Sequence, residues 1–147
     1  MKVSLVWSSP QPERTIATAM RRCYSTKPIE EIEAELGQKG PEYWRFLLTK
    51  ALQDRSLDVF EHYTMTLLIE DAREDEVNRI VVGYPHVRTT MLKPGLWLMS
   101  MNARTLVELW RDAGSRNFAD LVVSELSRRS IGVLFNELAF GVKVNAG

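Results

Sequence analysis

The chain has 147 residues, 45% of them hydrophobic and 26% charged, which is the composition of an ordinary globular domain with a core. Its 19 Lys and Arg residues balance its 19 Asp and Glu residues, so no net charge draws it to nucleic acid or to an anionic membrane. The single cysteine, Cys23, excludes an internal disulfide and a cysteine-based zinc site, and no apolar run has the length of a membrane span or the form of a signal peptide. We therefore expect one cytoplasmic domain over residues 1–147 that binds no metal, membrane or nucleic acid.

The N-terminal half predicts a strand, three helices and a second strand. Residues 2–7 alternate and are rich in β-forming types, which indicates a strand. Apolar residues at helical spacing predict a helix over residues 13–24. Pro28 and Pro41 suit the first turn of a helix, and each is expected to open one. The apolar and β-branched run over residues 63–69 indicates the second strand.

The next part of the chain predicts a helix, a strand and a further helix. Residues 71–83 carry apolar side chains at helical spacing after a charged start. A Lys-Pro-Gly turn at residues 93–95 precedes residues 96–101, which read as a buried strand. Asn102 is a natural N-cap for the helix that follows.

The C-terminal part predicts one long helical region over residues 117–138, with Leu121 and Leu126 facing inward and a break at Gly132. The tail from Gly141 is expected to be frayed. Helices and strands are mixed, and no glycine-rich phosphate-binding fingerprint follows a strand. The pattern therefore predicts an α+β fold, with an antiparallel or mixed sheet packed with helices.

Four segments, in chain order, carry a more specific pattern. Residues 21–25 read R-R-C-Y-S, residues 60–70 read F-E-H-Y-T-M-T-L-L-I-E, and residues 100–106 read S-M-N-A-R-T-L. Amphipathic helices follow. These segments are similar to the R-x-C-Y-S, L-E-H-x-x-F-T-F-x-I-E and S-x-N-A-R-x-L segments of the flavin-dependent thymidylate synthases. The resemblance implies the fold of that family, which is also known as that of the thymidylate synthase-complementing proteins.

The resemblance also implies a chemistry and a set of site residues. Members of the family transfer a methylene group from a folate to dUMP and reduce it with a flavin hydride, in sites built by several chains of a homotetramer. Asn102 and Arg104 match positions that contact FAD, and Glu61 matches an acidic position near the cofactor. Asp58 is the fourth implied cofactor-binding residue, at a position where the family more often has serine or threonine. The implied ligands are therefore FAD and a nucleotide, and arginine suits both because its planar fork matches phosphate oxygens.

The chain departs from the family in the arginine-rich signature, R-H-R followed by S, N-E and S-x-R. Gapless counting places Val-Val-Gly, residues 81–83, where R-H-R should be. Asn78 falls where the family usually has glutamine. Arg79, His86 and Arg88 are the nearby cations that could replace the lost charges in space. The candidate substrate-binding residues are therefore Asn78, Arg79 and Arg88.

Two further departures affect the nucleotide side of the family site. The long segment that the family places before S-x-N-A-R is missing, and Ala113 takes the place of an arginine that binds dUMP. These losses count against ordinary thymidylate synthesis and leave open whether the chain is an enzyme.

Each candidate residue also has a purely structural interpretation. Arg104 is either a phosphate ligand or a surface arginine, although a cation at a helix start is opposed by the helix dipole and needs a reason. Asn102 is expected to cap its helix, which is compatible with a cofactor contact. His62 is expected to make a structural hydrogen bond, and Cys23 to be a small buried core residue.

Three functions follow from these observations. The first is a flavin-binding, homo-oligomeric protein of this family that has lost ordinary thymidylate synthesis. The second is a non-catalytic module that binds a nucleotide or pairs with a full-length synthase. The third is active thymidylate synthesis with relocated arginines.

Overall fold

A four-stranded antiparallel sheet organises the computed structural model, which describes residues 1–143. The strands lie in the order β1-β2-β4-β3, and their bounds are β1 (Lys2–Ser8), β2 (Thr64–Glu70), β3 (Arg88–Lys93) and β4 (Leu96–Asn102). Helices accompany the sheet, so the α+β prediction is confirmed in its antiparallel form.

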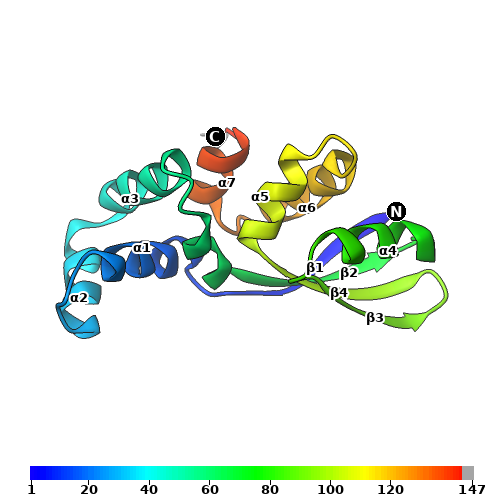
Figure 1. Ribbon diagram of the computed structural model, residues 1–147, viewed down its shortest axis with the longest axis horizontal. Coiled ribbons are helices and arrows are strands. Elements are labelled where there is room, and N and C mark those ends of the chain that lie inside the picture. The colour runs from blue at the N-terminus through cyan, green and yellow to red at the C-terminus, as the bar shows by residue number, and fades with distance from the viewer. Residues whose placement is uncertain (144–147) are drawn as a thin grey trace.

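The helices of the described range connect and cover these strands (Figure 1). They are α1 (Pro12–Cys23), α2 (Ile29–Lys39), α3 (Pro41–Gln53), the short 3-10 helix η1 (Leu57–His62), α4 (Glu74–Gly83), α5 (Ala103–Arg111), α6 (Arg116–Arg128) and α7 (Val133–Phe140). In Figure 1, α1, α2 and α3 gather at one end of the molecule, and the sheet extends away from them. Within residues 1–143, no helix combines the length and the apolar character that a bilayer span requires.

One face of the sheet is buried and the other is partly open. Alternate side chains point to opposite faces of a strand. On β1, β2 and β4, the side chains that point to the buried face are apolar. The buried set is Val3, Leu5, Met65, Leu67, Ile69, Trp97, Met99 and Met101. Helix α6 packs against β1 on this side, and α5 packs against β4. On the opposite face Trp7 is exposed, and the hydroxyls of Thr66 and Ser100 form a hydrogen bond of 3.0 Å across β2 and β4.

The start of α7 is built from residues far apart in the sequence. Gly132 precedes the helix with φ of 63°, a left-handed conformation that favours glycine. The Glu13 carboxylate, from the first turn of α1, accepts the backbone N–H of Phe135 at 3.3 Å. The Tyr63 hydroxyl is buried beneath Gly132 and has no hydrogen-bond partner among the described residues. The Phe135 ring packs edge-on against Tyr63, with 5.5 Å between ring centroids.

Most predicted elements are confirmed within a few residues, but one strand was not predicted and two expectations are wrong. Strand β3 was not predicted, because most of its side chains are exposed and no apolar alternation marks it. Cys23 is exposed rather than buried, because it is the last residue of α1, where the helix leaves the core. Leu121 is exposed on α6, whose buried side is formed by neighbours such as Val122.

The predicted break at Gly132 is confirmed, since it separates α6 from α7. Helix α7 ends before Gly141, which has φ of 69°. Residues 144–147, the rest of that tail, lie outside the described part of the chain.

Candidate functional site

The pairing of β2 with β4 brings the two most family-like segments together. Thr64 pairs with Asn102, and the backbone N–H of Ala103 donates to the Tyr63 carbonyl oxygen at 2.7 Å. Because the strands are antiparallel, the residues just before β2 and just after β4 lie at the same end of the sheet. Helix η1 precedes β2 and α5 follows β4 directly, so Glu61 and Arg104 meet across this end.

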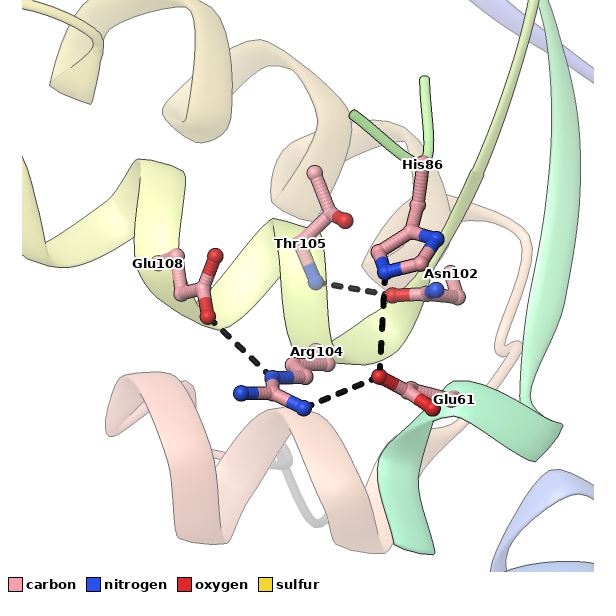
Figure 2. Close-up of polar contacts among 6 residues, drawn as sticks. All are labelled: Glu61, His86, Asn102, Arg104, Thr105 and Glu108. Atoms are coloured by element: carbon pink, nitrogen blue, oxygen red, sulfur yellow. Dashed lines mark hydrogen bonds and ion pairs between the residues drawn. The ribbon is translucent and has the colours of Figure 1, made fainter. Parts of the chain in front are cut away.

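Arg104 is held by two carboxylates, as Figure 2 shows. Its Nη1 donates to Glu61 Oε1 at 2.9 Å, and its Nε donates to Glu108 Oε1 at 3.2 Å. Hydrogen bonds to Glu108 and then to Glu61 raise the pKa of the Arg104 guanidinium, which therefore stays charged. These two ion pairs explain how a cation is accommodated at a helix start, where the helix dipole opposes it. They also fix the orientation of the Arg104 side chain, which remains 38% exposed.

Asn102 caps α5, as the sequence predicted. Its Oδ1 accepts the backbone N–H of Thr105 at 2.9 Å, and the residue is 8% exposed. The cap satisfies one of the N–H groups that the first turn of a helix leaves unpaired. Asn102 therefore fixes the direction of the first turn of α5, which carries Arg104.

His86 joins the cluster from the loop between α4 and β3. Its Nε2 lies 4.0 Å from Glu61 Oε1, and the ring is exposed (Figure 2). In the predicted family resemblance, His86 is one of three cations that could replace the missing R-H-R charges in space. Among the described contacts of these three cations, it is His86 that reaches the Glu61–Arg104 pair.

The charge balance of this cluster decides what it could hold. Glu61, Arg104 and Glu108 together carry one net negative charge. Arg104 Nη2 makes no hydrogen bond with any other described residue, so one donor remains for an anionic oxygen. Glu61 is 35% exposed and can accept hydrogen bonds from hydroxyl groups. The cluster thus fits a hydroxyl-bearing ligand with a single phosphate contact, and a complete diphosphate would need cations beyond these residues.

The other predicted site residues lie outside the cluster. Asp58 is exposed on η1 and lines a groove of about 680 Å³, together with His62. His62 makes no side-chain hydrogen bond with a described residue, so its expected structural bond is not found within residues 1–143. Arg79 lines a smaller cavity of about 280 Å³ between α4 and the start of α6. Asn78 is exposed on α4.

Residues 81–83, where the resemblance would place R-H-R, fall on an exposed helix end. Residues 81–83 form the end of α4, and Val82 is 85% exposed. Arg88 is exposed at the start of β3, where it pairs with Ser100. The three candidate substrate-binding residues, Asn78, Arg79 and Arg88, therefore do not converge with Arg104 through any described contact.

Sequence reasoning missed Glu108. Its spacing of four residues from Arg104 on a predicted helix is the signal that could have found it, since side chains four apart meet on one helix face. Among the described residues, no three His, Cys, Asp or Glu side chains are grouped as a metal site requires.

Comparison of the chain with models of known protein families finds no match, and comparison with curated proteins finds none. The resemblance to flavin-dependent thymidylate synthases therefore stays a prediction. It rests on the segments around Glu61 and Arg104, which the fold brings into contact.

Proposed function

We propose that this chain is a flavin-dependent thymidylate synthase-like protein that binds FAD or a related nucleotide at the start of α5. The observation that carries the proposal is the ion pair between Glu61 and Arg104. It joins the E-H and N-A-R segments, which lie 43 positions apart in the sequence, at 2.9 Å. These are the two segments in which the family resemblance is most specific.

The proposed ligand contacts follow from the chemistry of the cluster. Arg104 donates to a phosphate oxygen through its unused Nη2, and Glu61 accepts from ribose or ribityl hydroxyls. Asn102 holds the first turn of α5 in place. FAD, when bound, supplies the redox chemistry, while these residues bind and orient it.

A cytoplasmic homo-oligomer, with the homotetramer of the family as the expected form, completes the proposal. The cluster on one chain carries one net negative charge, so the remaining cations for a diphosphate are proposed to come from a neighbouring chain. Light scattering of the purified protein tests this point. A protein that remains monomeric while it binds FAD would contradict a site shared between chains.

The main test is direct. We expect the purified protein to be yellow or to take up FAD in a fluorescence titration. Arg104→Ala should weaken FAD binding about tenfold or more, because a charge-assisted hydrogen bond contributes about 1.5–3 kcal/mol. Arg116→Ala is the matched control, since Arg116 also pairs with a carboxylate four residues on and is similarly exposed. A colourless protein that takes up no FAD would refute the proposal.

A second candidate is a non-catalytic module of the same fold that binds a nucleotide or assembles with a full-length synthase. The side chains of residues 81–83 favour it, because none is cationic where the family signature would stand. Val82, in the middle of this segment, is exposed. Thermal stabilisation by a nucleotide, but not by FAD, would support this module. Growth of a thymidine-requiring strain that carries the gene would instead support active thymidylate synthesis.

A further inference from the structure

The two edges of the sheet are protected to different degrees. Strand β1 forms one edge, and its Leu5 backbone N–H donates to Glu125 Oε1 at 3.4 Å. Helix α6, which carries Glu125, packs against β1, and the Glu125 side chain is 8% exposed. Strand β3 forms the other edge, at the outer border of the sheet in Figure 1. Among residues 1–143, no side chain forms a hydrogen bond with the main chain of β3, so this edge lacks such cover.

The main chain of β3 is open along its outer side. An antiparallel edge strand directs the N–H and C=O groups of alternate residues away from its neighbour. All residues of β3 except the half-buried Thr89 are exposed. A register shift lies between Met91 and Lys93, so regular pairing with β4 covers residues 88–91. An extended peptide can add to an edge of this kind and gain main-chain hydrogen bonds.

The side chains of β3 combine two positive ends with an apolar centre. Arg88 and Lys93 are its charged residues, and neither forms an ion pair within residues 1–143. Five steps of about 3.4 Å place them about 17 Å apart along the strand. Met91 and Leu92, between them, are 52% and 53% exposed. Met91 pairs with the buried Trp97 of β4, so an apolar side chain beside Met91 would extend the apolar face of the sheet.

The same charges decide which strand can pair with this edge. Antiparallel pairing of two complete β3 strands would put Arg88 of each copy opposite Lys93 of the other. Parallel pairing in register would put each charge opposite its own copy. Like charges in directly opposite positions destabilise a strand pair, whereas opposite charges stabilise it. Arg88 and Lys93 therefore oppose a second copy of β3 and favour a strand with acidic ends.

We propose that β3 is the docking edge for an extended acidic segment of a partner protein, which adds to the sheet as a fifth strand. The main chain of the segment pairs with β3, its acidic side chains meet Arg88 and Lys93, and an apolar side chain covers Met91. The edge shares no residue with the Glu61–Arg104 cluster, so this interaction does not depend on FAD.

A short peptide tests the chemistry of the edge. The probe is a dye-labelled hexapeptide of sequence Glu-Thr-Val-Thr-Val-Glu with blocked termini, and its binding is followed by fluorescence anisotropy. We expect saturable binding that weakens at high salt, because exposed charges are screened. The same peptide with lysine in place of both glutamates should bind about tenfold or more weakly. Equal affinities of the two peptides, or no binding of the acidic one, overturns the proposal.

Pairing through the main chain has a signature that a charge contact lacks. Alternate residues of an added strand direct their N–H groups toward β3. N-methylation of one alternate set of peptide nitrogens therefore removes the hydrogen bonds to β3, and methylation of the other set leaves them in place. One methylated peptide should bind about tenfold or more weakly than the parent peptide, and the other should retain most of its affinity. Equal affinities of the two methylated peptides contradict strand addition.

Charge reversal locates the binding site on β3. The double variant with Arg88→Glu and Lys93→Glu should lose affinity for the acidic peptide about tenfold or more and gain affinity for the lysine peptide. This gain shows that the variant is folded. Arg111→Glu with Arg129→Glu is the matched control, since it changes the net charge equally at exposed sites elsewhere, and it should retain the preference for the acidic peptide. Failure of the β3 variant to change the preference overturns the docking edge.

Two further measurements separate this edge from the other contacts of the chain. Arg104→Ala should leave peptide affinity unchanged even where it weakens FAD binding, and loss of the peptide in that variant would move the site to α5. Light scattering should give the same oligomeric state for the parent protein and for the β3 charge-reversal variant. A change in that state would assign the edge to contact between copies of this chain and overturn the proposal.

Discussion

The first turns of α5 and α7 both contain backbone N–H groups that need an acceptor outside the helix ladder, and the two helices obtain it in different ways. Asn102 caps α5 from three residues away, with its oxygen 2.9 Å from the Thr105 nitrogen. Gly132 stands at the cap position of α7 and has no side chain, so Glu13 caps that helix from the other end of the sequence. The first start depends on a local motif, and the second depends on the packing of α1 against the C-terminal part of the chain.

The two starts also differ in how well their polar groups are satisfied. Around α5, Arg104 has two carboxylate partners. Around α7, the buried Tyr63 hydroxyl has no partner in the described range, and Gly132 needs a left-handed backbone. We expect substitutions at α7 to report packing and strain, and substitutions at α5 to report capping and exposed electrostatics.

The largest expected effect is at Gly132. A Cβ there would lie 2.9 Å from the Tyr63 hydroxyl, and a side chain is disfavoured at φ of 63°. Gly132→Ala should lower the free energy of unfolding by about 2–4 kcal/mol, as measured by urea denaturation. Gly141→Ala is the matched control, since φ is 69° there and nothing lies within 4 Å of the added carbon. Equal losses in both variants would mean that the contact with Tyr63 adds no strain.

The local cap of α5 should come next in size. Asn102→Ala should destabilise the protein by about 1–2 kcal/mol, because the Thr105 N–H loses its acceptor inside a buried site. Asn102→Asp keeps an acceptor and should recover most of this loss. If thermal denaturation shows no difference between the Ala and Asp variants, the cap does not contribute to stability.

Removing the unpaired hydroxyl should stabilise the start of α7. Tyr63→Phe should gain about 1 kcal/mol, because a buried hydroxyl without a partner loses its hydrogen bonds to water on folding. A decrease in unfolding free energy at neutral pH would show that the hydroxyl does have a stabilising contact.

The same residue sets an alkaline limit to stability. Burial, and then the nearby Glu13 charge, raise the pKa of the Tyr63 hydroxyl above its ordinary value. Below about pH 10 the hydroxyl is protonated in both states, and above this pH the unfolded chain ionises first. Tyr63 therefore adds no pH dependence below about pH 10, and above it the ionisation of Tyr63 in the unfolded chain lowers the free energy of unfolding. Between about pH 9 and 11, the free energy of unfolding of the Tyr63→Phe variant should fall less steeply with pH than that of the parent protein, as measured by denaturation curves.

The smallest effect should be at the Arg104–Glu61 pair. Both side chains are more than one-third exposed, so solvent screens their attraction. A double-mutant cycle with Arg104→Ala and Glu61→Ala should give a coupling energy of about 0.2–1 kcal/mol that falls at high salt. A coupling above about 2 kcal/mol would indicate that the pair is buried in the protein as it exists in solution.

These two helix starts show how far the sequence could predict the structure. The cap at Asn102 was predictable because its cause lies within one turn of helix. The break at Gly132 was predictable from glycine alone, but the partners of that site were not. Nothing in the sequence near residue 13 or residue 63 indicates that both side chains reach the start of α7.

The same distinction holds for the strands and for the candidate site. Strands β2 and β4 were predicted because buried apolar residues form continuous runs, and the edge strand β1 because its residues alternate, whereas β3 carries mostly exposed side chains. Asn102 and Arg104 were found by their motif. The contacts of Arg104 with Glu61 and His86 depend on strand register and on the loop after α4, which no local pattern encodes.

The place of β1 in the sheet has a consequence for the order of folding. β3 and β4 are joined by a tight turn, and β2 precedes them with only α4 between β2 and β3. β1 instead pairs Lys2 with Glu70, and three helices lie between the two strands in the sequence. Because closing a long loop costs more chain entropy than closing a short one, β1 should join last, after its partner strand is already in place. Until then, the hydrogen-bonding edge of β2 is open, and a second unfolded chain can compete for it.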